Sequence, residues 1–350
     1  MQDTLQQRGP DSADPVITAR NVSVTYDLEH RDAMVLDDVS IDLRRGEILG
    51  VVGESGSGKS MLANAMMDAV EEPGITTGEV TYHPEDGDPV DVLDLSHDEL
   101  NEFRWEEVSM VFQGALSSFN PTMDIRGHFE ETLEAHDYDV DEGMERARQL
   151  LSDLYLNPDR VLDSYAHELS GGMSQRALIA LSLILEPQVL LMDEPTAALD
   201  LLMQRSILSL LADIKEKYDL TILFITHDLP LVAGLADRLA ILYAFELAEV
   251  GTAEQIAHNS KHPYTRALLQ AVPNLDAPTE SMRPIEGTAP NPAHVPDGCH
   301  YAPRCPLATK ECHNESPPWV DVEEDHRSAC FHYDEADEAV PFDLEEVSDA

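Results

Sequence analysis

Positively charged residues are scarce in this 350-residue chain. Lysine and arginine together number 22, against 68 aspartates and glutamates, so the formal net charge is −46. The acidic residues are spread along the whole chain rather than gathered in a tail. Such a surface repels nucleic acid, and the composition therefore argues against a nucleic-acid partner.

Lysine is especially rare, with five in the chain: Lys59, Lys215, Lys217, Lys261 and Lys310. Few lysines combined with dispersed carboxylates resemble the proteins of halophiles, which accumulate salt. In molar salt the Debye length falls to roughly 3 Å, so the self-repulsion of this surface would be largely screened. A merely acidic protein of a low-salt cytosol is the alternative, and the dependence of thermal stability on KCl distinguishes the two.

Long apolar runs are also absent. The longest apolar segment, Ala177 to Leu185, is too short to span a bilayer. The opening MQDTLQQRGPDSADP has neither a basic start nor an apolar run, so we do not expect a secretory signal. Hydrophobic residues still make up 43% of the chain, enough for a buried core. At a membrane, other subunits would have to hold the protein in place.

Hydrophobic patterning predicts an α/β domain. Alternating or short apolar runs indicate strands, the first two expected to pair antiparallel, and longer helical spacing indicates helices. The predicted strands are 15–26, 35–43, 47–52, 188–192 and 220–226, and the predicted helices are 59–70, 144–154, 169–185, 201–217 and 265–272.

Composition divides the chain into segments. Beyond about residue 256 prolines become frequent and all four cysteines occur, so a separate module is expected there. The predicted organisation is a flexible N-terminus (1–14), an α/β nucleotide-binding domain (15–255) with an inserted helical subdomain (about 101–175), a C-terminal module (256–333) and an acidic disordered tail (334–350).

The strongest motif lies between a predicted strand and a predicted helix. Gly53-Glu54-Ser55-Gly56-Ser57-Gly58-Lys59-Ser60 matches the phosphate-binding pattern G-x-x-x-x-G-K-[ST]. Glycines such as Gly53, Gly56 and Gly58 let backbone N–H groups, with that of Ser55, turn inward around phosphate oxygens. Lys59 is expected to reach the β- and γ-phosphates of ATP, and the Ser60 hydroxyl to ligate Mg²⁺.

A second motif ends a buried strand. Four apolar residues, 189–192, are followed directly by Asp193 and Glu194. Ligands bind at the carboxyl edge of the strands in α/β sheets. Asp193 is expected to hold the Mg²⁺ shell, and Glu194 stands where a general base could polarise the attacking water.

Between these motifs lies Leu169-Ser170-Gly171-Gly172-Met173, which looks like the ABC signature sequence. With this order of motifs, residues 16 to about 255 resemble the ABC ATPases, which implies a P-loop cassette with a mixed sheet core, an antiparallel β subdomain and an inserted helical subdomain. Smaller family elements then fall into register: the Q-loop glutamine Gln113, the D-loop Ala198-Leu199-Asp200, the switch histidine His227 and the adenine-stacking Tyr26.

The resemblance implies how these residues act. Ser170, Gly171 and Gly172 would meet the γ-phosphate of ATP bound on a partner subunit, so that two ATPase subunits enclose the nucleotide. Gln113 would contact Mg²⁺ or the lytic water, and His227 would orient that water near Glu194. For Tyr26 packing in the sheet core is the alternative.

Further residues narrow the resemblance to ATPase subunits of oligopeptide and dipeptide importers, whose close relatives import nickel. They are Phe119-Asn120-Pro121, Tyr165-Ala166-His167-Glu168, the run 262–269, Ile285-Glu286-Gly287, Gly298-Cys299 and Pro303-Arg304-Cys305-Pro306. Two departures exist: Gly114-Ala115 replaces Asp-Pro after the Q-loop, which leaves the coupling to the membrane subunits open, and Phe245-Glu246 replaces a glycine-containing turn.

The four cysteines, Cys299, Cys305, Cys312 and Cys330, have the spacing C-x5-C-x6-C-x17-C. Their gathering in one module indicates a soft-metal site. Structural zinc favours closer pairs, whereas iron–sulfur clusters accept more varied spacing. Similar importer subunits carry a [4Fe–4S] cluster on this pattern, so that cluster is the expected occupant, with zinc and plain thiols or disulfides as the alternatives.

Together these features predict an ATP-hydrolysing importer motor at the cytoplasmic face of the cell membrane. Its expected partners are two transmembrane permease subunits, a second ATPase subunit and, indirectly, an extracellular solute-binding protein. The cargo is expected to be peptide, with nickel or another small solute as an alternative. A soluble ABC protein acting on ribosomes or DNA is the rival from another class.

Overall fold

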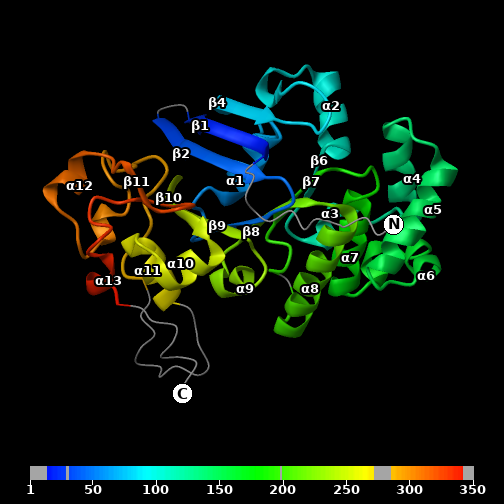
Figure 1. The fold of residues 1–350 in the computed structure, drawn as a ribbon. Helices are drawn as coiled ribbons and strands as arrows, with labels where there is room; N and C mark the ends of the chain where they lie inside the picture. Colours follow the sequence, from blue (N-terminus) through cyan, green and yellow to red (C-terminus); the bar gives the residue numbers. More distant parts are fainter. Residues whose placement is uncertain (1–13, 29–30, 198, 272–284, 342–350) are drawn as a thin grey trace, which may run out of the picture.

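A computed structural model describes residues 14–28, 31–197, 199–271 and 285–341 (Figure 1). Its strands are β1 (Pro15–Leu28), β2 (Arg31–Arg44), β3 (Ile48–Val52), β4 (Gly74–Tyr82), β5 (Val90–Asp91), β6 (Val108–Val111), β7 (Val189–Asp193), β8 (Thr221–Thr226), β9 (Arg238–Tyr243), β10 (Glu246–Thr252), β11 (Trp319–Glu323) and β12 (His326–Ala329).

The longer helices are α1 (Lys59–Met66), α2 (His97–Glu106), α4 (Ile125–Ala135), α5 (Val140–Asp153), α7 (Gly171–Ser182), α8 (Leu201–Tyr218), α10 (Ala253–Asn259) and α11 (Pro263–Gln270). The short ones are α3 (Ala115–Ser118), α6 (Pro158–Leu162), α9 (Leu229–Ala233), α12 (Lys310–Asn314), α13 (Ala336–Ala339) and the 3₁₀ turns η1 (Val92–Asp94), η2 (Ala166–Glu168) and η3 (Ala302–Arg304).

Two sheets organise the molecule. A four-stranded antiparallel sheet has the order β2-β1-β4-β5, and an eight-stranded mixed sheet has the order β11-β12-β10-β9-β3-β8-β7-β6. The five strands from β9 to β6 run parallel, and β10, β12 and β11 continue that sheet antiparallel. The predicted antiparallel pairing of the first two strands is therefore confirmed.

The central strands are buried on both faces, which explains their uninterrupted apolar sequences. Successive side chains alternate between two cores, as strand geometry requires. Leu190 and Met192 of β7 pack in the core formed with the helices, whereas Val189 and Leu191 pack in the core shared with α1 and the antiparallel sheet. Strand β8 divides its residues in the same way.

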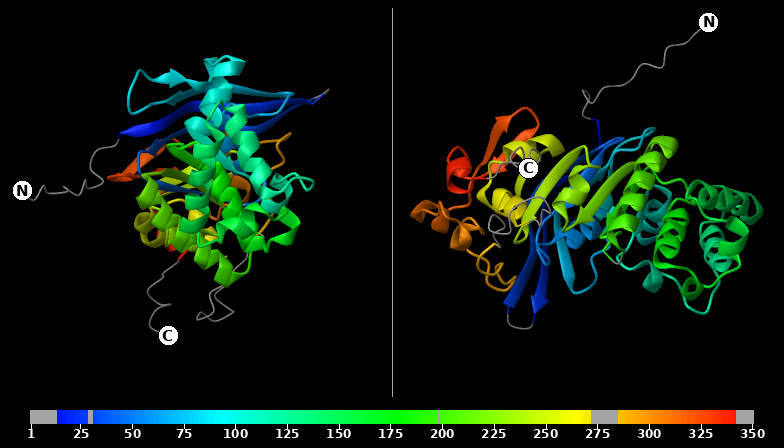
Figure 2. Two further views of the ribbon diagram at one scale, coloured as in Figure 1. Left: turned by 90° about the vertical axis from the view of Figure 1, so that its right-hand side faces the viewer. Right: turned by 90° about the horizontal axis from the view of Figure 1, so that it is seen from below.

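The helical region and the C-terminal segment lie at opposite ends of the mixed sheet. Figures 1 and 2 show α4, α5 and α6 beyond the β6 edge, and β11, β12 and α12 at the other end. The sheet continues through β12 and β11 across the predicted boundary at residue 255, so the C-terminal segment contributes strands to the same sheet as the phosphate-loop strand β3.

Two predicted boundaries need correction. The helix predicted over 59–70 ends at Met66, because the backbone turns at Asp68, which has a left-handed φ of 49°. The stretch 101–175, predicted as a helical subdomain, contains β6, a four-residue strand that pairs parallel with β7. Such a short apolar run gives no helical or strand periodicity by itself, so its place in the sheet is decided by β7.

The predicted disordered tail is also partly ordered. Within 334–341, α13 packs Ala336 out of solvent, and Asp337 pairs with Lys261 at 2.5 Å and with Arg266 at 2.9 Å. The negative charge that suggested disorder here pairs instead with the buried Arg266 and the partly buried Lys261. The remainder of the tail, 342–350, and the N-terminal residues 1–13 lie outside the described residues.

None of the described helices combines the length and the apolar character that a membrane span requires.

Candidate functional site

The phosphate-binding loop joins β3 to α1, as predicted. Gly58 precedes the first residue of α1 with φ 105°, a left-handed conformation that a side chain disfavours. A Cβ at this position would also lie 2.6 Å from the Val35 carbonyl oxygen. Gly56 is left-handed too, with φ 79°. The loop therefore needs glycine where the motif supplies it, and it opens onto the N-terminus of a helix.

Lys59 closes the base of this loop. Its Nζ donates to the carbonyl oxygens of Gly53 and Glu54, each at 2.9 Å. Burial lowers the pKa of Lys59, and the carboxylates of Glu194, Asp193 and Glu54 act in the opposite direction. The Lys59 ammonium therefore lies inside the phosphate loop, bonded to two loop carbonyl oxygens and close to three carboxylates.

Asp193 stands at the end of β7 beside the phosphate loop. Its carboxylate is buried and accepts a hydrogen bond from the Ser60 hydroxyl. Burial raises the pKa of Asp193, and Ser60 and Lys59 partly oppose that rise. Among the described residues, no donor reaches its buried Oδ1 atom. A hydroxyl next to an unpartnered carboxylate oxygen is a donor set that fits Mg²⁺, which prefers oxygen ligands.

Three predicted residues from three strand ends meet at Glu194. Gln113 follows β6, Glu194 follows β7 and His227 follows β8, all at the carboxyl edge of neighbouring parallel strands. Gln113 Nε2 donates to Glu194 Oε2 at 3.2 Å, and His227 Nδ1 lies 3.1 Å from Glu194 Oε1. The sheet topology therefore brings together three side chains that are spread over more than a hundred residues of sequence.

Glu194 occupies an unusual backbone conformation, with φ 45°. Such a left-handed conformation in a non-glycine residue has an energetic cost and tends to occur at functional sites. Its carboxylate lines a small cavity together with His227. Asp228 and Gln204 line the same cavity and were missed in the sequence, although Asp228 directly follows the predicted histidine.

The signature residues lie elsewhere on the surface. Ser170 caps α7 by accepting from the Met173 N–H at 3.4 Å, and Gly171 and Gly172 begin that helix. Ser170 and Gly171 are exposed, whereas Gly172 lies against Met203 of α8. Among the described residues, none of the three hydrogen-bonds with the phosphate loop.

Tyr26 and Asp200 have visible structural roles. Tyr26 is half-buried in β1, opposite Ala33 and Gly74 on the neighbouring strands. Asp200 caps α8 by accepting from Leu202 and Met203 N–H groups at 3.0 Å each. Ala198 of the predicted D-loop lies outside the described residues.

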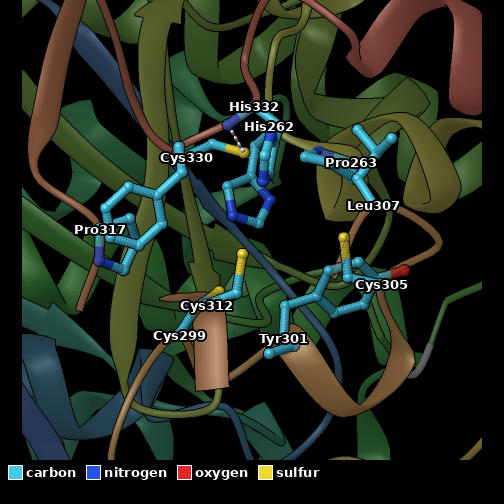
Figure 3. A pocket seen from close by; sticks show the side chains of 12 residues that line it. His262, Pro263, Cys299, Tyr301, Cys305, Leu307, Cys312, Pro317, Cys330 and His332 are labelled. Carbon is cyan, nitrogen blue, oxygen red and sulfur yellow. Dashed lines mark hydrogen bonds between the residues drawn. The ribbon is translucent and has the colours of Figure 1, made fainter. Parts of the chain in front are cut away.

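The four cysteines line one cavity, but the predicted iron–sulfur cluster is wrong (Figure 3). Among the described residues, no group of three or more Cys, His, Asp or Glu side chains has an arrangement able to hold a metal ion, so the zinc alternative has no support either. The cysteines are free thiols rather than disulfides.

The surroundings of these thiols explain the difference. Burial raises the pKa of Cys299 and of Cys330 to about 12 and that of Cys305 to about 11, which at these three residues favours the thiol over the thiolate that metals bind. Cys330 Sγ accepts from the His332 N–H at 3.4 Å, and Cys312 Sγ lies 3.3 Å from the Thr309 hydroxyl oxygen. The four thiols line one cavity, but the cysteine spacing does not define a coordination geometry for them.

Comparison with known proteins gives two family matches. Residues 36–197 match the family described as ABC transporter, and residues 248–312 match the family described as oligopeptide/dipeptide transporter, C-terminal region. The two matches cover the phosphate-loop region and the beginning of the cysteine-containing segment.

Individual relatives agree with this pattern. The chain is 38% identical over 323 residues to the dipeptide transport ATP-binding protein DppD of Caldanaerobacter subterraneus, covering 91% of this chain and 98% of the relative. It is 38% identical over 321 residues to the oligopeptide transport ATP-binding protein OppD of Escherichia coli, covering 91% and 94%.

Solved structures support the fold. The ATP-binding cassette MJ0796, described as a dimer in a post-hydrolysis state bound to ADP and Pi, is similar with a TM-score of 0.59 and 27% identity. The similarity covers 68% of this chain and 98% of that one. The predicted α/β cassette fold is thereby confirmed.

Proposed function

Because the chain belongs to the ATP-binding subunits of the oligopeptide/dipeptide ABC transporter family, we propose that it hydrolyses ATP to drive the uptake of dipeptides or oligopeptides across the cell membrane. The observation that carries the ATPase part is the convergence of Lys59, Asp193 and Glu194 with Gln113 and His227 at one edge of the sheet. The cargo is inferred from relatives, since the motor itself does not touch it.

The loop at 53–58 and the start of α1 would bind the phosphates of ATP. Lys59 would release the Gly53 and Glu54 carbonyl oxygens and donate to phosphate oxygens instead. Ser60 and Asp193 would hold Mg²⁺, and that ion would neutralise charge on the β- and γ-phosphates. Tyr26 is proposed to stack on the adenine from β1.

Glu194 is proposed to take the proton from the attacking water. The Gln113 amide, after β6, and the His227 ring, after β8, each contact one oxygen of the Glu194 carboxylate. These two contacts fix the direction of the lone pairs that face the water. Proton transfer to a positioned carboxylate contributes on the order of 10²- to 10⁴-fold to a rate. His227, with its largely exposed side chain, can also reach a phosphate oxygen.

We propose that two such subunits enclose each nucleotide. Ser170, Gly171 and Gly172 are presented at a helix N-terminus, where backbone N–H groups favour an anion. Because these residues make no hydrogen bond to the phosphate loop within the described part of their own chain, a second ATPase subunit would supply the opposing loop. Asp200, beyond its role as a helix cap, would lie at the same junction.

The remaining partners follow from the family. We propose that two permease subunits hold the chain at the cytoplasmic face of the membrane and that an extracellular binding protein delivers the cargo. Phe112, next to Gln113, and Leu116 of α3 are 51% and 53% exposed, apolar side chains suited to contact with a membrane subunit. We keep the division of the chain at residues 15–255 and 256–333 as part of this proposal.

The acidic composition supports a working environment of high salt. A net charge of −46 destabilises a compact chain unless salt screens the repulsion. On this proposal the melting temperature rises steeply between low and molar KCl. An unchanged or falling melting temperature over that range would contradict it.

Peptide import is tested by reconstituting the chain with its permease subunits and binding protein in liposomes. Added dipeptides and oligopeptides should stimulate ATP hydrolysis and accumulate inside. Stimulation by nickel ions with no response to peptides would replace peptide by nickel as the cargo. A protein that co-purifies with ribosomes and not with membrane subunits would overturn the transport function.

A further inference from the structure

Glu54, a variable position of the phosphate-loop motif, is held from outside the loop. Its carbonyl oxygen accepts from Lys59 Nζ at 2.9 Å and from the Ser57 N–H at 3.2 Å. Its own N–H donates to the Tyr264 hydroxyl at 3.0 Å, and its carboxylate accepts two hydrogen bonds from Arg304. Two of these partners, on α11 and η3, come from the segment that follows the cassette.

The Arg304 interaction has the geometry of a strong ion pair. Nη1 donates to Glu54 Oε2 at 2.8 Å and Nη2 to Oε1 at 3.0 Å, a two-pronged arrangement that fixes the carboxylate plane. The Arg304 side chain is only 6% exposed, so solvent screens the pair weakly. Nε donates to the Glu286 carbonyl oxygen at 2.8 Å, which orients the guanidinium further.

Three tyrosines support this arginine. The guanidinium lies over the rings of Tyr243 and Tyr301, at 5.6 and 6.0 Å from their centroids. The Tyr243 ring is 4.4 Å from that of Tyr264 and 5.1 Å from that of Tyr301. All three rings are buried, so the arginine stands on a rigid aromatic platform that also forms one wall of the cysteine cavity through Tyr301 (Figure 3).

A second contact holds the loop from the same side. The Phe245 N–H in the β9–β10 turn donates to the Ser57 carbonyl oxygen at 2.9 Å. The preceding residue, Ala244, accepts from His300 Nδ1, 2.6 Å away, in the C-terminal segment. The loop is therefore held at residues 54 and 57 by groups that involve Tyr264, His300 and Arg304.

The charge of Glu54 makes Arg304 more than a structural contact. A carboxylate in the phosphate loop repels the phosphates of ATP unless a cation neutralises it. Lys59 interacts electrostatically with Glu54 but must also serve the phosphates. When Lys59 leaves the Glu54 carbonyl oxygen to bind nucleotide, Arg304 and Tyr264 become the groups that keep residue 54 in place.

We propose that Arg304 is a positioning residue of the ATP site, which neutralises Glu54 and holds the phosphate loop in its nucleotide-binding shape through the C-terminal segment. On this proposal, the C-terminal segment that follows the cassette is part of the nucleotide site. This inference concerns ATP binding alone, so its outcome does not depend on which cargo is transported.

The test measures MgATP affinity of the full chain by calorimetry, and KM and kcat for ATP in the assembled transporter. R304Q should weaken MgATP binding and raise KM about tenfold, while kcat at saturating ATP stays within about twofold. R304K keeps the charge without the two-pronged geometry and should restore part of the affinity.

The matched control is R44Q. Arg44 also joins the C-terminal segment to the cassette by a two-pronged pair, with Asp325 at 3.2 and 2.5 Å, but it does not touch the phosphate loop. It should leave MgATP affinity unchanged. Equal losses in R44Q and R304Q would show that Arg304 acts only by attaching the segment, and the proposal would be wrong.

A double-variant cycle keeps the proposal testable if R304Q is poorly folded. E54Q removes the carboxylate that needs neutralising and should alter affinity less than about threefold. In the E54Q background, R304Q should also cost less than about threefold, against about tenfold alone. The same loss in both backgrounds, or unchanged MgATP affinity in folded R304Q, overturns the proposal.

Discussion

The edge of the sheet at Glu194 and the cysteine cavity both gather chemically reactive side chains, yet only the first has the features of a working site. At the sheet edge, no donor in the described part of the chain reaches the buried Oδ1 of Asp193, and Glu194, in a costly backbone conformation, is oriented by two side chains. In the cavity, the surroundings raise the pKa of Cys299, Cys305 and Cys330, which favours uncharged thiols among the apolar groups and rings of the lining. The types of residue present do not distinguish the sheet edge from the cysteine cavity. The difference lies in a buried polar atom left without a donor and in a carboxylate held in a fixed orientation.

The largest effect is expected at the sheet edge. Glu194→Gln removes the proposed base while keeping the shape of the side chain, so ATP hydrolysis should fall at least about 100-fold with MgATP binding retained. Phosphate release and nucleotide affinity, measured on the same preparation, check both parts. Glu254→Gln on α10, an exposed carboxylate, is the control and should leave both unchanged. Normal turnover of the Glu194 variant would falsify the assignment.

Lys59→Ala should reduce nucleotide binding itself. Loss of a charged donor to phosphate is worth about 1.5–3 kcal/mol, which corresponds to roughly a 10- to 100-fold rise in the Kd for MgATP. Calorimetric titration with MgATP measures it. Lys310→Ala, at an exposed lysine on α12, is the matched control. Equal affinity of the two variants would place the phosphates somewhere other than this loop.

Near the cysteine cavity, a change of pH should alter the stability of the folded chain through Glu246 rather than the rate of ATP hydrolysis. Burial raises the pKa of Glu246 to about 8, an effect that Asp37 and Asp38 reinforce and the His300 N–H opposes. The folded chain therefore binds a proton that the unfolded chain releases near pH 4.5, so this group's contribution to the free energy of unfolding is lost as pH rises toward 8.

The melting temperature should accordingly fall by a few degrees between pH 5.5 and 8.5, more in the parent chain than in E246Q, which resembles the protonated carboxyl. Thermal melts of both proteins at fixed salt measure the difference. Identical pH profiles would mean that Glu246 does not bind the extra proton.

The smallest effects are expected for the thiols. Cys312→Ala and Cys330→Ala each remove one buried sulfur from the cavity wall, which should lower the melting temperature by a few degrees at most and leave ATP hydrolysis within about twofold. Adding a chelator should not change the melting temperature of the parent chain. Stoichiometric iron or zinc in the purified protein, or a collapse of stability with chelator, would reverse the contrast between the two regions.

Two of the predicted site residues that the structure brings together, Glu194 and His227, each directly follow a short buried strand. Glu194 and His227 could be placed because parallel strands end at a common edge, so local position implies proximity. The cassette fold could be predicted for a related reason. The phosphate-loop and signature motifs are each continuous in sequence, so a single sequence shows both motifs and their order.

The features that could not be predicted from the sequence are interactions between residues far apart in the chain. Arg304 and Glu54 are 250 residues apart, and nothing in the pattern around either residue indicates the other. The ordering of Asp337 depends on Lys261 and Arg266 in the same way. The cysteine prediction failed because spacing restricts which thiols can be near one another but not the directions in which their sulfurs point.

The pairing of β12 with β10 has a consequence for the solubility of any shortened chain. Cutting the protein at the proposed boundary near residue 255 would remove β12 from one side of β10, which stays paired with β9, and leave the backbone groups on that side open to another molecule. It would also uncover Glu249, which is buried against His326. In the whole chain the outer edge is instead β11, a short strand carrying Asp321 and Glu323, whose charges discourage edge-to-edge aggregation.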